Sequence, residues 1–474
     1  MSALWTGPEL IAAVSGKVMG GKTDGTIPDI SGVSIDSRSV KPGDLFIALK
    51  GPSFDGHDFV VQALQQGAAA ALVATDIKDA APIVRVADTQ VALEDLGAAS
   101  RARLEGASIA VTGSVGKTST KEMLAACFGA LGPTHASVGS FNNQWGVPLT
   151  LARMPRETRY GVFEIGMNHA GEIALLSPQA KPNIAIITTI EPAHMEFFAS
   201  LEAIADAKAE IFLGQAPGAV AILNRDNGQF ARLARAAEAR DLAIIDFGTA
   251  SGAKARLVSA DAAGDGMAIA AEIDGKPIRY HLSLAGMHMA MNSVAALAAV
   301  AAAGGDVALA ASALGDLASL AGRGKRSPIH VAGGQALLID ESYNASPAAM
   351  RAAIRVLGLT PVSGQGRRIA VLGDMRELGE QSPALHRQLA EPLIEAGIDL
   401  VFTVGPLMKG LAETLPTPKR GGHADTAAAL LPDLVASLRA GDVVTVKGSL
   451  GTRMADIVKP LLAATSPVAK DGTC

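Results

Sequence analysis

The chain has 474 residues, enough for about three domains that each bury a hydrophobic core. Hydrophobic residues make up 49% and charged residues 18%, which is typical of a globular protein and not of a disordered one. A net charge of −5 and an aromatic content of 4% argue against a broad basic surface or base-stacking platforms, so we expect no nucleic-acid partner.

Two cysteines are too few for a disulfide framework and favour a reducing cytosol. The N-terminus lacks a basic segment followed by an apolar core, so no signal peptide is expected. The most apolar stretch, residues 284–305, is mostly alanine and is interrupted by His288 and Asn292, which favours a buried helix over a membrane span. We therefore expect a cytoplasmic protein without membrane insertion.

The first 106 residues predict a small α/β domain. Thr6 and Glu9 have the spacing of a capping box that starts a helix through Val14. Apolar runs predict strands at residues 33–35, 44–49, 69–74 and 83–87, and helices at residues 57–66 and 91–104. Polar loops at residues 36–39 and 51–57 follow predicted strands, where small molecules often bind, although ordinary turns have the same composition.

A phosphate-binding loop is predicted at residues 108–118. The apolar residues 109–111 predict a buried strand that enters a glycine-rich turn, and Lys117 and Thr118 open a predicted helix. Backbone N–H groups and the helix N-terminus would then bind phosphates, Lys117 would reach the outer phosphates and Thr118 could ligate Mg²⁺. Val111 replaces the first glycine of the usual spacing, so a glycine-rich turn without a ligand is the alternative.

Alternating strands and helices from residue 107 to 322 predict a mostly parallel sheet with helices on both faces. Short alternating strands at about residues 257–284 predict an antiparallel annex, and an alanine-rich helix is expected at residues 287–303. Residues 322–328 are rich in glycine and charge and predict a linker to a third α/β domain, residues 323–474. Strands of that domain are predicted at residues 336–339, 368–372, 400–404 and 443–446.

Several polar clusters follow predicted strands of the central sheet, where ligands of open α/β sheets bind. They include Asn142 and Asn143, Glu164 and His194, while Lys208 lies on a predicted helix. Each alone is typical of a helix cap or a solvated side chain. Beside a phosphate loop, however, a carboxylate and an imidazole could hold Mg²⁺ against ATP.

Taken together, these motifs resemble the Mur ligase family, ATP-dependent amino-acid ligases of peptidoglycan synthesis. The resemblance spans essentially the whole chain and includes the shifted glycine of the phosphate loop. It rests on residues 36–38, 51–57, 112–118, 142–148, 164–168, 193–194, 207–210, 340–344, 373–379 and 447–449.

The resemblance implies an enzyme that joins D-alanyl-D-alanine to a UDP-N-acetylmuramoyl-tripeptide at the expense of ATP, through an acyl phosphate. The UDP-sugar peptide would bind the first domain, and the dipeptide would be brought by the third. The implied substrate-binding residues are Asp36, Ser37, Arg38, Asp55, His57, Asn142, Asn143, Lys447 and Ser449. The implied nucleotide-binding residues are Thr112, Gly113, Ser114, Val115, Gly116, Lys117, Thr118, Asn292, Asp340 and Glu341.

By the same resemblance, Lys117, Glu164, His194 and Lys208 would be catalytic, with Thr118, Glu164, His194 and Lys208 at the metal. Lys208 matches a lysine that is carbamylated in the family. Addition of CO₂ turns the cationic side chain into an anion, which explains why a lysine would lie near Mg²⁺. The protein is expected to be a monomer.

Two positions depart from the family pattern. Met289 stands where an asparagine is usual, and the acidic pair is Asp340-Glu341, which leaves open which carboxylate faces the nucleotide. Another amino-acid ligase of the family is one alternative. A nucleotide-dependent switch is another, although a switch needs no convergence of Glu164, His194 and Lys208.

Overall fold

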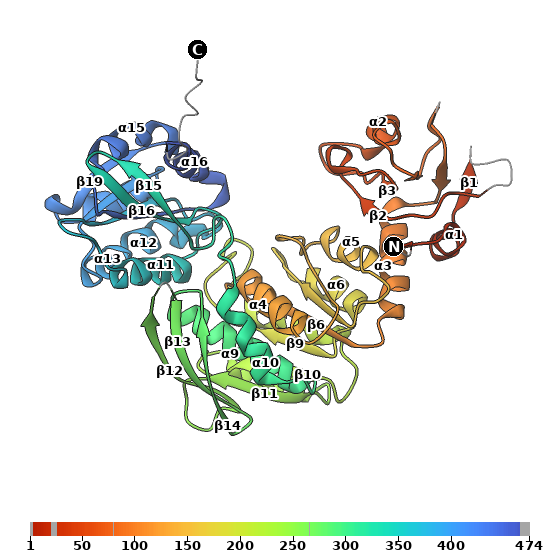
Figure 1. The fold of residues 1–474 in the computed structure, drawn as a ribbon, viewed down its shortest axis with the longest axis horizontal. Coiled ribbons are helices and arrows are strands. Elements are labelled where there is room, and N and C mark those ends of the chain that lie inside the picture. Colours follow the sequence, from red (N-terminus) through yellow and green to blue (C-terminus); the bar gives the residue numbers. More distant parts are fainter. Residues whose placement is uncertain (1–2, 20–25, 79, 265, 465–474) are drawn as a thin grey trace, which may run out of the picture.

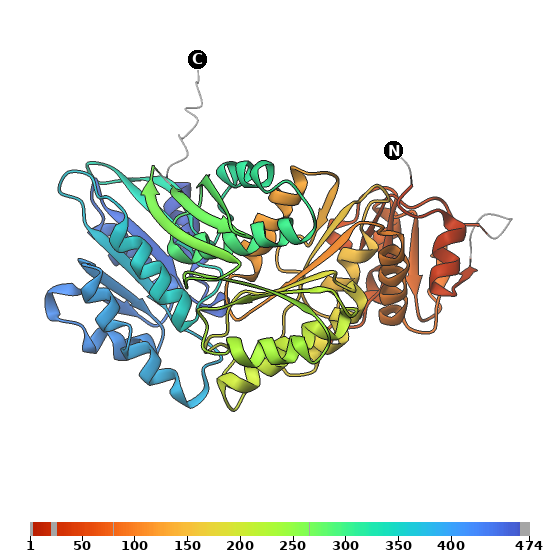
Figure 2. The same cartoon turned by 90° about the horizontal axis from the view of Figure 1, so that it is seen from below.

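The computed structural model describes residues 3–19, 26–78, 80–264 and 266–464. They form three α/β domains, each built on its own sheet of five, nine or six strands. In two perpendicular views the first and third domains lie at opposite ends of the central domain (Figures 1 and 2). The three-domain α/β fold predicted from the sequence is confirmed.

The first domain has the strand order β1-β5-β4-β3-β2. The predicted capping box is present, since Thr6 accepts from the backbone of Glu9 and the Glu9 side chain reaches back to Thr6. An unpredicted strand, β1, pairs antiparallel with β5 at the edge of the sheet. The elements are α1 (Gly7–Val14), β1 (Lys17–Met19), β2 (Gly32–Ser34), β3 (Asp44–Ile47), α2 (Val60–Gln65), β4 (Ala70–Val73), β5 (Ile83–Arg85) and α3 (Thr89–Arg103).

The central domain has the strand order β14-β13-β12-β11-β10-β9-β6-β8-β7. Its strands are β6 (Ala107–Thr112), β7 (Thr134–Ala136), β8 (Tyr160–Glu164), β9 (Ile184–Ile187), β10 (Val220–Asn224), β11 (Ala243–Gly248), β12 (Ala255–Ala263), β13 (Gly266–Ile273) and β14 (Lys276–Leu282). Strands β7 to β12 pair in parallel and β12 to β14 antiparallel, which confirms both the parallel sheet and the annex.

Helices cover both faces of the central sheet. One hydrophobic cluster joins it to α4 (Lys117–Gly129), α9 (Met287–Ala302) and α10 (Val307–Ser312). A second cluster joins the other face to α5 (Gly146–Ala152), α6 (Glu172–Ala180), α7 (Leu201–Ala209) and α8 (Phe230–Glu238). Because β6 lies between β8 and β9, the carboxyl ends of these three parallel strands meet at one edge.

The third domain has the strand order β15-β16-β20-β17-β18-β19. Its strands are β15 (Lys325–Val331), β16 (Gly334–Glu341), β17 (Arg368–Gly373), β18 (Leu400–Val404), β19 (Arg420–Ala424) and β20 (Val443–Lys447). Its helices are α11 (Pro347–Leu359), α12 (Ser382–Arg387), α13 (Ala390–Glu395), α14 (Met408–Thr414), α15 (Ala427–Ser437) and α16 (Ala455–Ala463).

The predicted linker at residues 322–328 is wrong in its second half, because residues 325–328 belong to β15. This strand forms the antiparallel edge of the sheet, where Pro328 and charged side chains are tolerated. Within the part of the chain that the structure describes, no helix has the length and apolar character needed to cross a membrane.

Candidate functional site

The loop between β6 and α4 has the backbone conformation of a phosphate cradle. Gly113 and Gly116 have φ angles of 148° and 85°, which favour glycine. A Cβ atom on Gly113 would lie 1.9 Å from Oγ1 of Thr188. The Lys117 ammonium crosses the loop and donates to the Gly113 carbonyl over 2.7 Å. This loop therefore leaves the N-terminus of α4 open to an anionic ligand.

Glu164, at the end of β8, is only 1% exposed. Its Oε1 accepts from Nδ2 of Asn142 over 2.6 Å, while its buried Oε2 has no hydrogen-bond partner. A buried carboxylate oxygen without a donor is costly unless a cation or a polar ligand meets it. Burial lowers the pKa of Lys117, and the charge of Glu164 opposes that shift, so the two side chains lie within electrostatic reach of one another.

His194 follows β9 and also belongs to this region. Its Nδ1 lies 2.6 Å from Oε2 of Glu377, which belongs to the third domain. Burial and then the charge of Lys117 lower the pKa of the imidazole, while Glu377 raises it.

Lys208 is 1% exposed, and its ammonium has no hydrogen bond or ion pair with any described residue. Burial, with the charge of Lys117 second, holds its pKa well below the usual value. Its acidic neighbours are occupied elsewhere: Asp206 pairs with Arg232, and Glu210 accepts from the backbone of residues 171 and 174. Lys208 is thus a buried amine without a counter-charge among the described residues.

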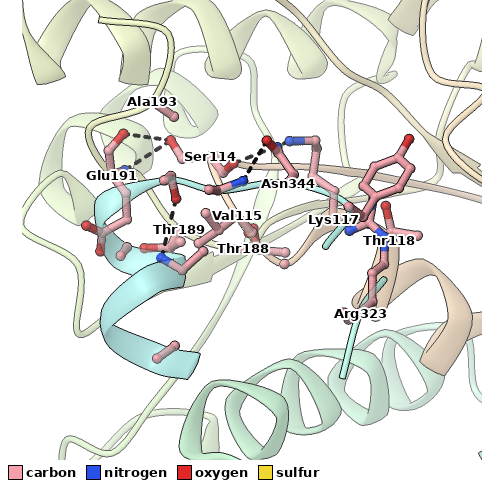
Figure 3. Close-up of a pocket in the computed structure, with 18 of the residues that line it drawn as sticks. Ser114, Val115, Lys117, Thr118, Thr188, Thr189, Glu191, Ala193, Arg323 and Asn344 are labelled. Carbon is pink, nitrogen blue, oxygen red and sulfur yellow. Dashed lines mark hydrogen bonds between the residues drawn. The ribbon is translucent and has the colours of Figure 1, made fainter. Parts of the chain in front are cut away.

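A cavity of about 860 Å³ lies between the phosphate loop and the third domain. Figure 3 shows Ser114, Glu191 and Ala193 at one end and Lys117, Thr118 and Arg323 at the other. The predicted residues that line it are Ser114, Val115, Gly116, Lys117, Thr118, Asn142, Asn143, Glu164, His194, Asn292, Glu341, Lys447 and Ser449. Thr112, Gly113, Lys208 and Asp340 are not among its lining residues.

The structure separates the roles of the acidic pair. Asp340 is buried, and its oxygens accept from Gly322 N (2.7 Å) and from the backbone and hydroxyl of Ser342 (3.0 and 2.6 Å). Glu341 instead lines the cavity and binds Nζ of Lys447 over 3.2 Å. Asp340 therefore holds the linker, and Glu341 is the carboxylate available to a ligand.

The predicted residues of the first domain lie away from this cavity. Asp36 and Asp55 each cap a short 3₁₀ turn. Arg38 pairs with Asp36 over 2.7 Å and leaves 85% of its side chain exposed. His57 is more constrained, since Nδ1 contacts Asp55 and Nε2 accepts from the backbone of residue 74. These side chains, and Ser37 with them, belong to the loops that follow β2 and β3, and none of them lines the cavity; these loops are a second region.

An aromatic pair joins that region to the central domain. Phe54 is 46% exposed and meets Trp145 edge-on, with 6.0 Å between the ring centroids. Trp145 lies two positions after the cavity-lining residue Asn143, so the chain connects the two regions over a short distance.

Several residues that line the cavity were not predicted as site residues, among them Arg323, Tyr343 and Glu377. Arg323 and Tyr343 line the cavity, with the guanidinium 4.3 Å from the ring centroid, and both bind the hydroxyl of Ser140. Glu377 lines it as the partner of His194. In the sequence Arg323 is part of a glycine-rich linker and carries no signal. Tyr343 and Glu377 lie within the motifs 340–344 and 373–379 that carry the family resemblance, but the motifs alone assign them no role.

This arrangement fits a nucleotide with Mg²⁺. The backbone cradle and Lys117 suit phosphates, and the unpartnered oxygen of Glu164 suits a divalent cation beside the buried hydroxyl of Thr118. Among the described residues, no three His, Cys, Asp or Glu side chains gather closely enough to hold a metal themselves. An ion here would therefore share its coordination with phosphate oxygens and water, as Mg²⁺ does in nucleotide sites.

The domain architecture and this site define a class of protein. The Mur ligase family catalytic domain matches residues 29–126, the Mur ligase middle domain residues 111–300, and the Mur ligase glutamate ligase domain residues 325–450. The chain belongs to the Mur ligase family, which confirms the resemblance seen in its motifs.

The similarity extends over whole proteins. A UDP-N-acetylmuramoyl-tripeptide–D-alanyl-D-alanine ligase from Escherichia coli (strain K12) is 35% identical over 459 residues, 96% of this chain and 98% of the relative. A crystal structure of MurF from Acinetobacter baumannii matches with a TM-score of 0.83 and 32% identity, covering 97% and 99%. MurF ligase from Thermotoga maritima in complex with ADP matches with a TM-score of 0.77 and 27% identity, covering 91% and 97%.

Proposed function

We propose that this enzyme joins D-alanyl-D-alanine to UDP-N-acetylmuramoyl-tripeptide with ATP, in the cytoplasm, where ATP is available. The observation that supports this most is the cavity in which a phosphate loop faces a second domain across a buried, unpartnered carboxylate oxygen. The full-length relative with this activity and the ADP complex of a similar structure support the same proposal.

The chemistry must activate a poor electrophile. A carboxylate oxygen of the tripeptide attacks the γ-phosphorus of ATP, which yields an acyl phosphate and ADP. The amine of the dipeptide then attacks the acyl carbon, expels inorganic phosphate and loses a proton to form the amide. Enclosure between the central and third domains protects the acyl phosphate from water.

The residues that line the cavity have different proposed roles. Lys117 and the N-terminus of α4 stabilise negative charge on the transferring phosphoryl group. Bound Mg²⁺, held by Thr118, Glu164 and His194, would neutralise phosphate charge there. Asn292 and Glu341 would bind the nucleoside, while Asn142 and Asn143 would meet the sugar peptide.

The outer domains supply the two substrates. The first domain would bind the UDP-sugar through Asp36, Ser37, Arg38, Asp55 and His57, and the third would bring the dipeptide near Lys447 and Ser449. Lys447 and Ser449 line the cavity, whereas the residues of the first domain do not.

The activity is tested by ATP-dependent phosphate release with purified protein. Release is expected only when UDP-N-acetylmuramoyl-tripeptide and D-alanyl-D-alanine are both present. Lys117→Ala is expected to lower kcat/KM by about 10³-fold or more, the scale on which fixed charge stabilises phosphoryl transfer. Lys276→Ala, at an exposed lysine of the same domain, is the control. Turnover with another amino acid would favour another amino-acid ligase of the family. Nucleotide hydrolysis that does not depend on either substrate would favour a nucleotide-dependent switch.

Lys208 is proposed to be carbamylated. Carbamate formation needs a neutral amine, and burial lowers the pKa of Lys208 in the direction that supplies one. The neutral nitrogen attacks CO₂ and releases a proton, which leaves a carbamate anion where an ammonium cation would otherwise stand. Loss of charge also removes the repulsion between two lysines within electrostatic reach.

Lys208→Ala is therefore expected to lose most activity and to regain part of it with added acetate or formate, whose carboxylate can replace the carbamate. The Lys276→Ala control should respond to neither anion. Near-normal turnover of Lys208→Ala would contradict the carbamate.

A further inference from the structure

Two loops from different domains meet at the edge of the cavity. One follows β9 in the central domain and carries His194; the other follows β17 in the third domain and carries Glu377. Nδ1 of His194 lies 2.6 Å from Oε2 of Glu377, and the backbone N–H of Glu196 donates to the Glu377 carbonyl over 3.2 Å. The two domains therefore meet here through a side-chain bond and a backbone bond.

An unusual backbone conformation orients the side chains of both His194 and Glu377. His194 and Glu377 have φ angles of 57° and 62°, in the left-handed region that residues other than glycine rarely adopt. Such conformations persist only where the surroundings hold them, and they gather at functional sites. Glu377 keeps 45% of its side chain exposed, so the pair is reachable from the cavity and is not a packed core contact.

This bond decides which ring nitrogen His194 offers to a ligand. An imidazole that donates its Nδ1–H to a carboxylate keeps its lone pair on Nε2. Carboxylates placed behind metal-binding histidines fix the ring and the tautomer in this way. His194 lines the cavity together with Lys117 and Thr118, so Nε2 is the ring atom left for the phosphate end.

We propose that Glu377 is a positioning residue: from the third domain it orients His194 so that Nε2 serves the Mg²⁺–nucleotide site of the central domain. This inference rests on the proposed ATP-dependent function. It also means that the metal site is complete only while the third domain is docked, which ties metal affinity to domain arrangement.

The test measures binding of Mn²⁺, a paramagnetic substitute for Mg²⁺, to the full chain with ADP by electron paramagnetic resonance. Glu377→Gln keeps the size of the side chain and is expected to weaken Mn²⁺ binding about 10- to 100-fold, as other partners of metal-binding histidines do. ADP binding without a divalent ion should be unchanged. Glu380→Gln, three residues further and exposed, is the matched control and should bind Mn²⁺ like the unchanged protein.

A double-variant cycle separates positioning from a general structural effect. If Glu377 acts through His194, Glu377→Gln causes no further loss of Mn²⁺ affinity in a His194→Ala background. Unchanged Mn²⁺ affinity in Glu377→Gln, or an equal loss in both backgrounds, would overturn the proposal. Neither result would touch the proposed ligase activity, which is judged by substrate-dependent phosphate release from the unchanged protein.

Discussion

The two junctions of the central domain are built differently. Towards the first domain it shares a hydrophobic core: Leu149 and Ala152 of α5 belong to one cluster with Trp5 and Leu93. The indole N–H of Trp5 donates to the Ala152 carbonyl over 2.9 Å, deep in that junction. These two domains are packed as one unit.

Towards the third domain the contacts are mainly polar. Tyr343 donates to Ser140 over 2.8 Å, Arg323 reaches the same hydroxyl, and His194 meets Glu377. Among the described residues, no hydrophobic cluster has members on both sides of this junction. A polar junction opens at lower cost than a shared core. From this comparison we expect the first two domains to behave as one rigid unit and the third domain to move more readily.

The largest expected effect, and the most direct test of this comparison, is at Leu149, which is 1% exposed at the first junction. Leu149→Ala should lower the free energy of unfolding by about 2–5 kcal/mol, because it leaves a cavity in a shared core. Urea unfolding followed by circular dichroism measures the change. Leu175→Ala, at a leucine of α6 that is 72% exposed, should change it by less than about 0.5 kcal/mol. Equal effects of the two variants would show that the first junction is not a core.

Tyr343→Phe tests the junction with the third domain, and we expect a smaller effect on stability there. It removes one hydrogen bond across the second junction, so we expect a stability loss of about 0.5–1.5 kcal/mol. Because that bond joins two domains, the radius of gyration from small-angle scattering should also rise.

Tyr280→Phe is the matched control for that variant, since its hydroxyl binds Ser293 inside the central domain over 2.7 Å. It should cost similar stability without changing the scattering. Identical scattering of the two variants would contradict a movable second junction.

The sequence predicted the elements whose patterns are long and apolar, and missed those held by neighbours. The buried strands of the parallel sheets have continuous apolar runs, which local reading detects. Strand β1 has three residues, and β19 contains two consecutive glycines, so their pairing depends on tertiary contacts. Strand β15 contains charges and a proline, which predict a linker unless its place at a sheet edge is known.

The site divides in the same way. The phosphate loop and Glu164 follow strands of one sheet, so topology brings them together as predicted. The partnership of His194 with Glu377 spans 183 positions and depends on how two domains dock, which no local pattern encodes. The sequence also left open which member of the acidic pair faces the ligand, because that depends on the backbone N–H groups that Asp340 accepts from.

Both tryptophans of the chain, Trp5 and Trp145, lie at the first junction. Intrinsic tryptophan fluorescence therefore reports locally on the first junction, and no added label is needed. Indole emission follows the environment between the first two domains, and Trp145 beside the exposed ring of Phe54 will respond to a ligand that covers that aromatic pair. The third domain contains no tryptophan, so we expect its movement to change this emission less than a ligand at the first junction does.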